Sequence, residues 1–218
     1  MELLENSKRS IFSLLFVILL FNSATGQDFK TTGMAFEESY KYEKEGDFSH
    51  AIDQLKAVYD ENSYEINLRL GWLNYQAGVF NESISHYQRA VNLKPYAEEA
   101  KFGLVLPKAA IGKWDEVVNI YKEILKISPN QTVANYRLGL IFYGREDYEK
   151  ALQHFKKVVD LYPFGYDALI MLAWTNYRMG KSREALILFQ KSLWYFPSDP
   201  SALEGLKLLG QSQEKLSE

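Results

Sequence analysis

Few residues of this chain could do acid–base or metal chemistry, and they are scattered. The three histidines are His50, His86 and His154, and the chain has no cysteine. Disulfides, thiol nucleophiles and thiolate metal sites are therefore excluded. A periodicity of the sequence, described below, predicts that His86 and His154 lie at equivalent surface positions of two different helices, too far apart to share a metal ion. We expect no metal and no cofactor.

Motifs that carry catalysis are also missing from the sequence. It contains no glycine-rich phosphate loop and no His-Glu-x-x-His pair. We therefore predict that the protein is not an enzyme, and keep a catalytic site grafted on the scaffold as a remote alternative. The 218 residues, 47% of them hydrophobic, suffice for one domain with a sizeable core. The net charge of -3 gives no electrostatic reason to bind nucleic acid.

Short sequence motifs recur along the chain and indicate the structural elements that would position any functional site. GWLNYQAG at 71–78 returns as AWTNYRMG at 173–180, a step of 102 residues, or three times 34. Glycines recur on the 34-residue step at 78, 112 and 180, and Glu146 occupies the remaining slot. Prolines keep the same step at positions 95, 129, 163 and 197. A structural unit of this length is therefore repeated along the chain.

The order of glycine, aromatic, small residue, aromatic and proline within one such unit resembles the tetratricopeptide repeat. NLRLG at 67–71, which returns as NYRLG at 135–139, fits the first helix of that unit. The resemblance implies an all-α, right-handed α-solenoid of about five helix-turn-helix repeats over 32–199. The predicted repeats are 32–63, 64–97, 98–131, 132–165 and 166–199, followed by a capping helix and short tail over 200–218.

The repeat pattern also predicts packing. Phe155 and Phe189 should be core residues, and glycine should end the first helices in the left-handed conformation. Pro107 should remove a backbone hydrogen bond and kink the first helix of the third repeat. Lys108 follows it where the family usually has a large apolar residue. Two asparagines, at 74 and 176, occupy further apolar slots and would need hydrogen-bonding partners there.

The N-terminus has the order of a secretory signal peptide. Lys8 and Arg9 precede an apolar run at 11–21 that is too short to span a bilayer, and small residues follow at 23–26. We predict a signal peptide over 1–26, cleavage before Gln27, and a short linker over 27–31. The protein should then be exported, to the periplasm of a Gram-negative bacterium, with no stable membrane span. Secretion and retention by an uncleaved N-terminal anchor remain alternatives.

In the family that the sequence resembles, first helices line a concave groove that binds proteins. The same register places Glu43, Leu106, Leu140 and Ile170 on this face. Aromatics interleaved with arginine are typical of binding hot spots, so we predict an envelope or secreted protein as partner and leave the oligomeric state open. A carbohydrate- or cell-wall-binding module is the alternative. The predicted groove residues are Tyr40, Arg69, Trp72, Tyr75, Phe102, Tyr136, Arg137, Tyr143, Trp174, Tyr177 and Arg178.

Overall fold

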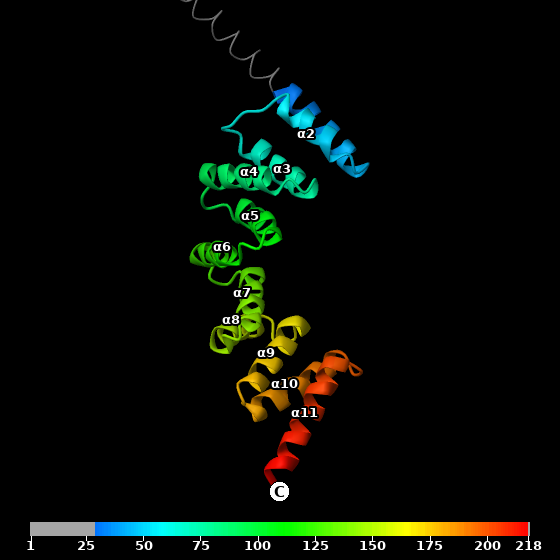
Figure 1. The fold of residues 1–218 in the computed structure, drawn as a ribbon, viewed down its shortest axis with the longest axis vertical. Coiled ribbons are helices and arrows are strands. Elements are labelled where there is room, and N and C mark those ends of the chain that lie inside the picture. The colour runs from blue at the N-terminus through cyan, green and yellow to red at the C-terminus, as the bar shows by residue number, and fades with distance from the viewer. Residues whose placement is uncertain (1–28, 218) are drawn as a thin grey trace, which may run out of the picture. The chain divides into compact units, whose positions relative to one another are not determined.

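The computed structural model describes the backbone of residues 29–217 and the side chains of residues 29–210. Every regular element in this part of the chain is a helix (Figure 1). The chain divides into two compact units, Met1–Ile111 and Gly112–Glu218, here called unit 1 and unit 2. The division falls inside the third predicted repeat. The predicted signal peptide over 1–26 lies outside the described residues.

Unit 1 begins, among its described residues, with a helix over 29–44. It is followed by α2 (Phe48–Lys56), α3 (Tyr64–Gln76), α4 (Phe80–Leu93) and α5 (Glu98–Ala110), and α3 packs against α2, α4 and α5. Residues 29–31, predicted as linker, already belong to the first helix. No proline interrupts this stretch, so the helix extends further towards the N-terminus than the repeat pattern indicated.

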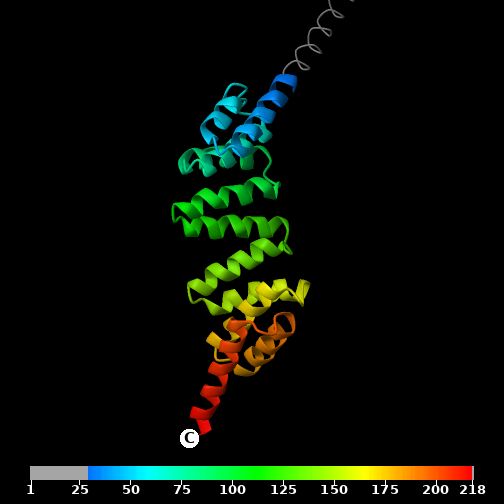
Figure 2. The same cartoon turned by 90° about the vertical axis from the view of Figure 1, so that its right-hand side faces the viewer.

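Unit 2 contains α6 (Trp114–Ile127), α7 (Thr132–Gly144), α8 (Tyr148–Leu161), α9 (Tyr166–Arg178), α10 (Ser182–Tyr195) and α11 (Pro200–Ser217). Each helix packs against the next along the chain, and α7 and α9 also touch (Figure 2). α11 packs on both α9 and α10, as a capping helix must. It is helical to Ser217, where a short tail was expected from the sequence.

Left-handed residues end the first helices of the helix pairs. Gly78, Gly112 and Gly180 have φ values of 75°, 76° and 72°. Glu146 adopts φ 59° at the fourth equivalent position, although it carries a Cβ atom. The predicted stop signal is therefore confirmed, and at Glu146 it operates with a residue whose Cβ adds a steric cost of about 1–2 kcal/mol.

Aromatic rings on the second helices fill the contacts between neighbouring helix pairs. Phe155 and Phe189 are completely buried, as predicted. Tyr87 is held between α3 and α5, because a Cβ on Gly71 would lie 2.7 Å from its ring, and one on Gly103 only 2.1 Å. Glycine is therefore required on both sides of this ring for α3, α4 and α5 to approach closely.

α5 is one helix from Glu98 to Ala110 even though it contains Pro107. The proline lies in the last turn, where its own carbonyl still accepts a hydrogen bond from the Ile111 N–H at 3.2 Å. Lys108 is buried beside it. The helix continues to Ala110 although Pro107 has no N–H to donate to the carbonyl of Gly103.

Candidate functional site

The predicted groove residues divide between the two units. Five of them belong to unit 1 and six to unit 2. Each unit has an open groove of its own. The unit 1 groove, about 530 Å³, is lined by Phe36, Tyr40, Tyr64, Glu65, Leu68, Arg69, Trp72, Tyr87, Glu99 and Gly103. The unit 2 groove, about 710 Å³, is lined by Thr132, Val133, Tyr136, Arg137, Val158, Tyr162, Gly165, Tyr166, Asp167, Ala168, Tyr195 and Phe196.

Arg69 occupies the wall of the unit 1 groove but is not a free surface cation. Its exposed fraction is only 8%. Its Nη2 lies 2.6 Å from Oε2 of Glu43, its Nε donates to the hydroxyl of Ser39 at 3.2 Å, and its guanidinium lies 3.8 Å from the ring centre of Tyr40. The expectation that Arg69 is interleaved among the aromatics for a partner is thus corrected, because an internal carboxylate already balances its charge.

Trp72 forms another part of this wall and is half-buried. Its indole Nε1 donates to Oε1 of Glu43 at 2.5 Å, and its ring packs on the core between the first helix, α2 and α3. Burial raises the pKa of Glu43, but hydrogen bonds from Arg69 and Trp72 outweigh it and hold this pKa below its usual value. Glu43 therefore stays ionised and fixes both side chains of the groove wall.

The unit 1 groove is also lined by two carboxylates that do not contact Arg69 or Trp72, those of Glu65 and Glu99. Glu65 pairs with the ammonium of Lys94 at 2.9 Å, and that ammonium also lies 4.2 Å from the ring centre of Tyr64. The hydroxyl of Tyr64 donates to Oε2 of Glu99 at 3.3 Å. Burial and the charge of Glu99 raise the pKa of Tyr64, so its phenol remains a hydrogen-bond donor at neutral pH.

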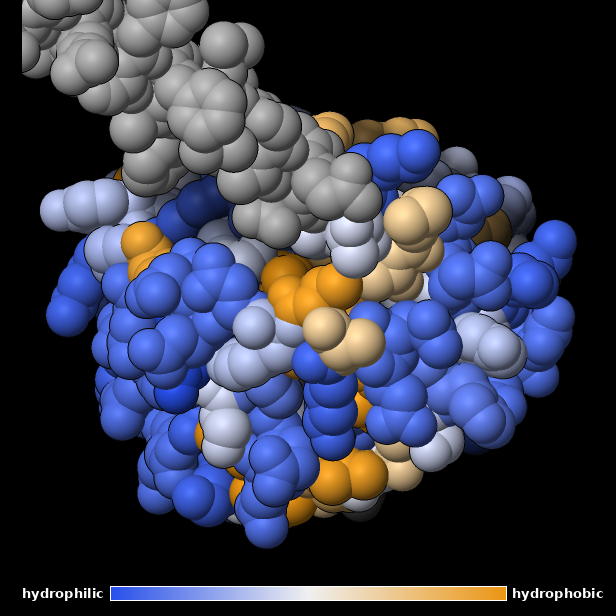
Figure 3. All heavy atoms as spheres, turned by 90° about the horizontal axis from the view of Figure 1, so that it is seen from above, coloured by the Kyte–Doolittle hydropathy of each residue, from blue (hydrophilic) through white to orange (hydrophobic). Residues whose placement is uncertain are grey.

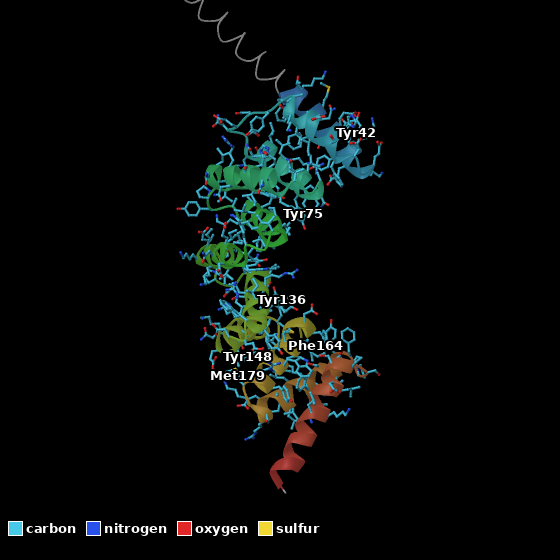
Figure 4. All side chains as sticks on the ribbon, viewed as in Figure 1. Tyr42, Tyr75, Tyr136, Tyr148, Phe164 and Met179 are labelled. Atoms are coloured by element: carbon cyan, nitrogen blue, oxygen red, sulfur yellow. The ribbon has the colours of Figure 1, made fainter. Side chains whose placement is uncertain are left out.

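The unit 2 groove combines aromatic rings with two exposed charges. Tyr136 is half-buried against Phe155, with ring centres 5.8 Å apart. Burial raises its pKa; Asp167 raises it further and Arg137 opposes this. Arg137 and Asp167 are both exposed and form no ion pair with each other or with any other described residue. The groove thus offers one free cation and one free anion beside its rings (Figure 4 labels Tyr136).

An aromatic cluster at one end of the unit 2 groove was not predicted from the sequence. Phe164 lies 4.9 Å from Tyr195, and Tyr166 lies 4.8 Å from Phe196, measured between ring centres. Tyr162, Phe164, Tyr195 and Phe196 are 60%, 52%, 42% and 49% exposed. Tyr195 is the last residue of the second helix α10, and the other three follow a second helix or lie in a turn, outside the first-helix register that the prediction used.

Six predicted residues line neither groove. They are Tyr75, Phe102, Tyr143, Trp174, Tyr177 and Arg178. Trp174 is half-buried against Phe189 and donates from its indole to the hydroxyl of Ser201 at 2.8 Å. Arg178 is 3.5 Å from Glu146 and lies over the ring of Tyr148. Contacts within unit 2 therefore already engage Trp174 and Arg178, which were predicted to face a partner.

The two asparagines at apolar slots of the repeat bond to carbonyls of their own helices. Nδ2 of Asn74 donates to the carbonyl of Leu70 at 2.8 Å, and Nδ2 of Asn176 donates to that of Leu172 at 2.8 Å. Both side chains are buried and hydrogen-bonded, so neither is available to a partner.

The wider surface and the remaining side-chain clusters add little to the grooves. On the face seen in Figure 3, hydrophilic residues predominate and hydrophobic ones form small separate patches. Among the described residues, no three histidine or carboxylate side chains are grouped so that they could hold a metal ion. No described helix is long and apolar enough to cross a membrane.

Comparison with known proteins places these helix pairs in a family. Models of the tetratricopeptide repeat match residues 37–98 and 131–193. The CTR9 homolog of Arabidopsis thaliana is 25% identical over 134 residues, which cover 59% of this chain and 12% of that protein. The chain therefore corresponds to a small part of this curated relative.

Solved structures share the fold. A tetratricopeptide repeat protein from Parabacteroides merdae superposes with a TM-score of 0.71 at 21% identity, over 85% of this chain and 75% of that one. A MamA protein superposes with a TM-score of 0.66 at 25% identity, over 75% of this chain and 91% of that one. MamA from Desulfovibrio magneticus superposes with a TM-score of 0.65 at 21% identity, over 78% of this chain and 97% of that one. The chain belongs to the tetratricopeptide repeat family, whose members are generally non-catalytic scaffolds for protein–protein interaction.

Proposed function

We propose that this protein is a non-catalytic adaptor of the bacterial cell envelope that holds a segment of a partner protein in the grooves of its repeats. The observation that carries the proposal is the exposed aromatic wall of the unit 2 groove, where Tyr162, Tyr195 and Phe196 remain 42–60% exposed. Large aromatic side chains at the surface are typical of binding hot spots.

The free charges of the unit 2 groove suit a peptide. An extended peptide presents carbonyl acceptors and N–H donors along its length, and charged side chains at intervals. Arg137 can donate to a carbonyl or carboxylate, and Asp167 can accept from an N–H or an ammonium. Apolar side chains of the same peptide would pack on the neighbouring rings.

Export of the protein is supported by sequence alone. The basic residues, short apolar run and small-residue site within 1–26 have the order of a secretory signal. We therefore propose the periplasm as the place where the partner is met.

Affinity capture from the native cell envelope tests the proposal. The bait is the chain from Gln27 onward, beside a Tyr162→Ala, Phe196→Ala variant of the unit 2 groove. A Tyr96→Ala, Trp194→Ala variant is the matched control, because these side chains are 82% and 74% exposed and line neither groove. Melting curves must first show that all three proteins are folded.

A protein captured by the parent and the control, but lost by the groove variant, is the expected result. Equal capture by all three baits would place the binding surface elsewhere. Capture that survives protease treatment of the extract, but is lost on glycosidase treatment, would instead support a carbohydrate-binding module.

A further inference from the structure

We infer that the unit 1 groove binds a cationic side chain, arginine or lysine, of the partner peptide; this deepens the proposed function and rests on it. Two features of the groove point to this chemistry: one carboxylate without a cation among the described residues, and aromatic rings of the kind that already hold cations there. Each is independent of the unit 2 groove.

The charges that line the groove leave one carboxylate over. Glu65 is paired with Lys94 at 2.9 Å, and Arg69 with Glu43 at 2.6 Å. Glu99 is exposed and, among the described residues, is within ion-pair distance of no cation. Within the described part of the chain, its carboxylate accepts a hydrogen bond from the Tyr64 hydroxyl. A guest that restores neutrality is therefore positively charged.

The rings of the groove already bind cations supplied by the chain. The guanidinium of Arg69 lies 3.8 Å from the centre of the Tyr40 ring, and the ammonium of Lys94 lies 4.2 Å from that of Tyr64. Aromatic faces attract cations through their quadrupole, most strongly where water is excluded. Trp72 and Phe36 line the same groove and provide further aromatic surface for a guest cation.

An anionic guest does not suit the same groove. A carboxylate bound there would meet Glu99 and Glu65 as like charges. Arg69 would not offset them, because Glu43 already balances its charge at 2.6 Å.

Indole resonances of the protein give a direct test. Trp72 is the only tryptophan of unit 1, whereas Trp114, Trp174 and Trp194 belong to unit 2. The ¹⁵N-labelled protein is titrated with acetyl-Ala-Arg-Ala-amide and with acetyl-Ala-citrulline-Ala-amide, which has nearly the same shape but no charge. We expect the arginine peptide to shift the Trp72 indole signal saturably, and the citrulline peptide to bind about tenfold more weakly, or about 1.4 kcal/mol.

Two glutamate variants locate the effect. Glu99→Gln keeps an acceptor for the Tyr64 hydroxyl and removes the charge, so it should abolish the preference for arginine over citrulline. Glu82→Gln removes an equally exposed charge from α4 outside the groove and should leave that preference unchanged. Spectra of both variants without peptide report whether they are folded.

The outcomes separate this inference from the proposed function. Equal affinity for both peptides overturns it, as does the absence of a Trp72 shift at about 10 mM arginine peptide, a concentration that saturates even millimolar sites. Tighter binding of acetyl-Ala-Glu-Ala-amide than of the arginine peptide would show that the groove prefers an anionic guest, and would also overturn the inference. If envelope capture through the unit 2 groove still succeeds in these cases, the adaptor function stands and only the cationic guest is rejected.

Discussion

Trp72 serves both the groove wall and the packing of unit 1. It is half-buried, and its indole is tied to Glu43. From the sequence, it was expected only as a groove side chain. The i, i+3 spacing did place Trp72 and Tyr75 together, with ring centres 6.0 Å apart. Spacing within one helix could not show that the preceding helix covers part of this face.

Truncation of a buried ring and truncation of Trp72 should therefore both lower the free energy of unfolding. Phe155→Ala removes a ring that is completely buried and should lower the free energy of unfolding by about 3–5 kcal/mol. Trp72→Ala loses packing and the bond to Glu43, and should cost roughly 2–3 kcal/mol, between the value for a surface residue and that for a buried ring. Urea unfolding monitored by circular dichroism measures both; a loss for Trp72→Ala no larger than that of a surface residue would contradict the packing of Trp72.

Glu146 carries a steric cost that glycine would remove. It has φ 59° at a turn where Gly78, Gly112 and Gly180 stand in the other repeats. Glu146→Gly should therefore raise the free energy of unfolding by about 1 kcal/mol. Glu146→Ala is the control, because it also loses the exposed contact with Arg178 but keeps the Cβ atom. Stabilisation by alanine as large as by glycine would show that charge, and not backbone strain, is responsible.

At the residue scale, some side-chain contacts could be predicted from the sequence and others could not. Glu43 and Arg69 were assigned to the same face, so their pairing could have been inferred from register alone. The contact between Phe164 and Tyr195 could not, since it joins a turn residue to the last residue of a second helix, and the first-helix register covers neither.

At the scale of helices, an asparagine joins each of two first helices to the second helix that follows. Nδ2 of Asn67 donates to the carbonyl of Ser63 at 2.8 Å, and its Oδ1 lies 3.1 Å from Nδ1 of His86. Asn135 makes the same contacts: its Nδ2 donates to the carbonyl of Gln131 at 3.0 Å, and its Oδ1 lies 3.1 Å from Nδ1 of His154. Since each amide oxygen can only accept, the histidine Nδ1 must carry the proton.

Stability should fall in mild acid because of these two histidines. Burial lowers the pKa of both histidines below 6.5. At His86 the charges of Lys56 and Arg89 lower the pKa further, while the charge of Glu82 opposes this. At His154 the charge of Lys122 lowers the pKa further. The unfolded chain then takes up protons first as pH drops below 6.5, so the free energy of unfolding decreases from that point downwards. Melting temperatures between pH 7.5 and pH 5.5 check this.

A double variant isolates the histidine contribution. His86→Gln, His154→Gln retains an N–H that can reach the asparagine but cannot titrate. Its melting temperature should change less between pH 7.5 and pH 5.5 than that of the parent. An unchanged slope would assign the pH dependence to other groups.

Helix pairs were the most predictable level of the molecule. Prolines and glycines on a 34-residue step indicated where helices begin and end, and the buried rings of Phe155 and Phe189 followed from the same register. The first helix was less predictable, because no breaker marks its start. α5 continues past Pro107, a residue from which the sequence predicted a kink.

At the scale of the whole molecule, each unit carries its own groove and its own balance of charge. Among the residues that the structure describes, Glu99 of the unit 1 groove has no cation at ion-pair distance, whereas the unit 2 groove offers Arg137 and Asp167. A partner could therefore engage the two units through different residues. No motif in the sequence identified this difference, because it depends on which charges the fold pairs internally.

Export makes a prediction about the mature chain. If the signal peptide is removed as proposed, intact mass spectrometry of the protein from its native envelope should find Gln27 at the N-terminus. A mass that includes the segment 1–26 would instead support an N-terminal anchor.

The asparagine–histidine link has a bearing on ancestry. It occurs at Asn67–His86 and again at Asn135–His154, two repeats later, and NLRLG and NYRLG have the same offset. Copying two adjacent repeats together would produce this offset in one event. Because each bond lies within a single repeat, 64–97 or 132–165, insertion or deletion of whole repeats would leave the remaining bonds intact.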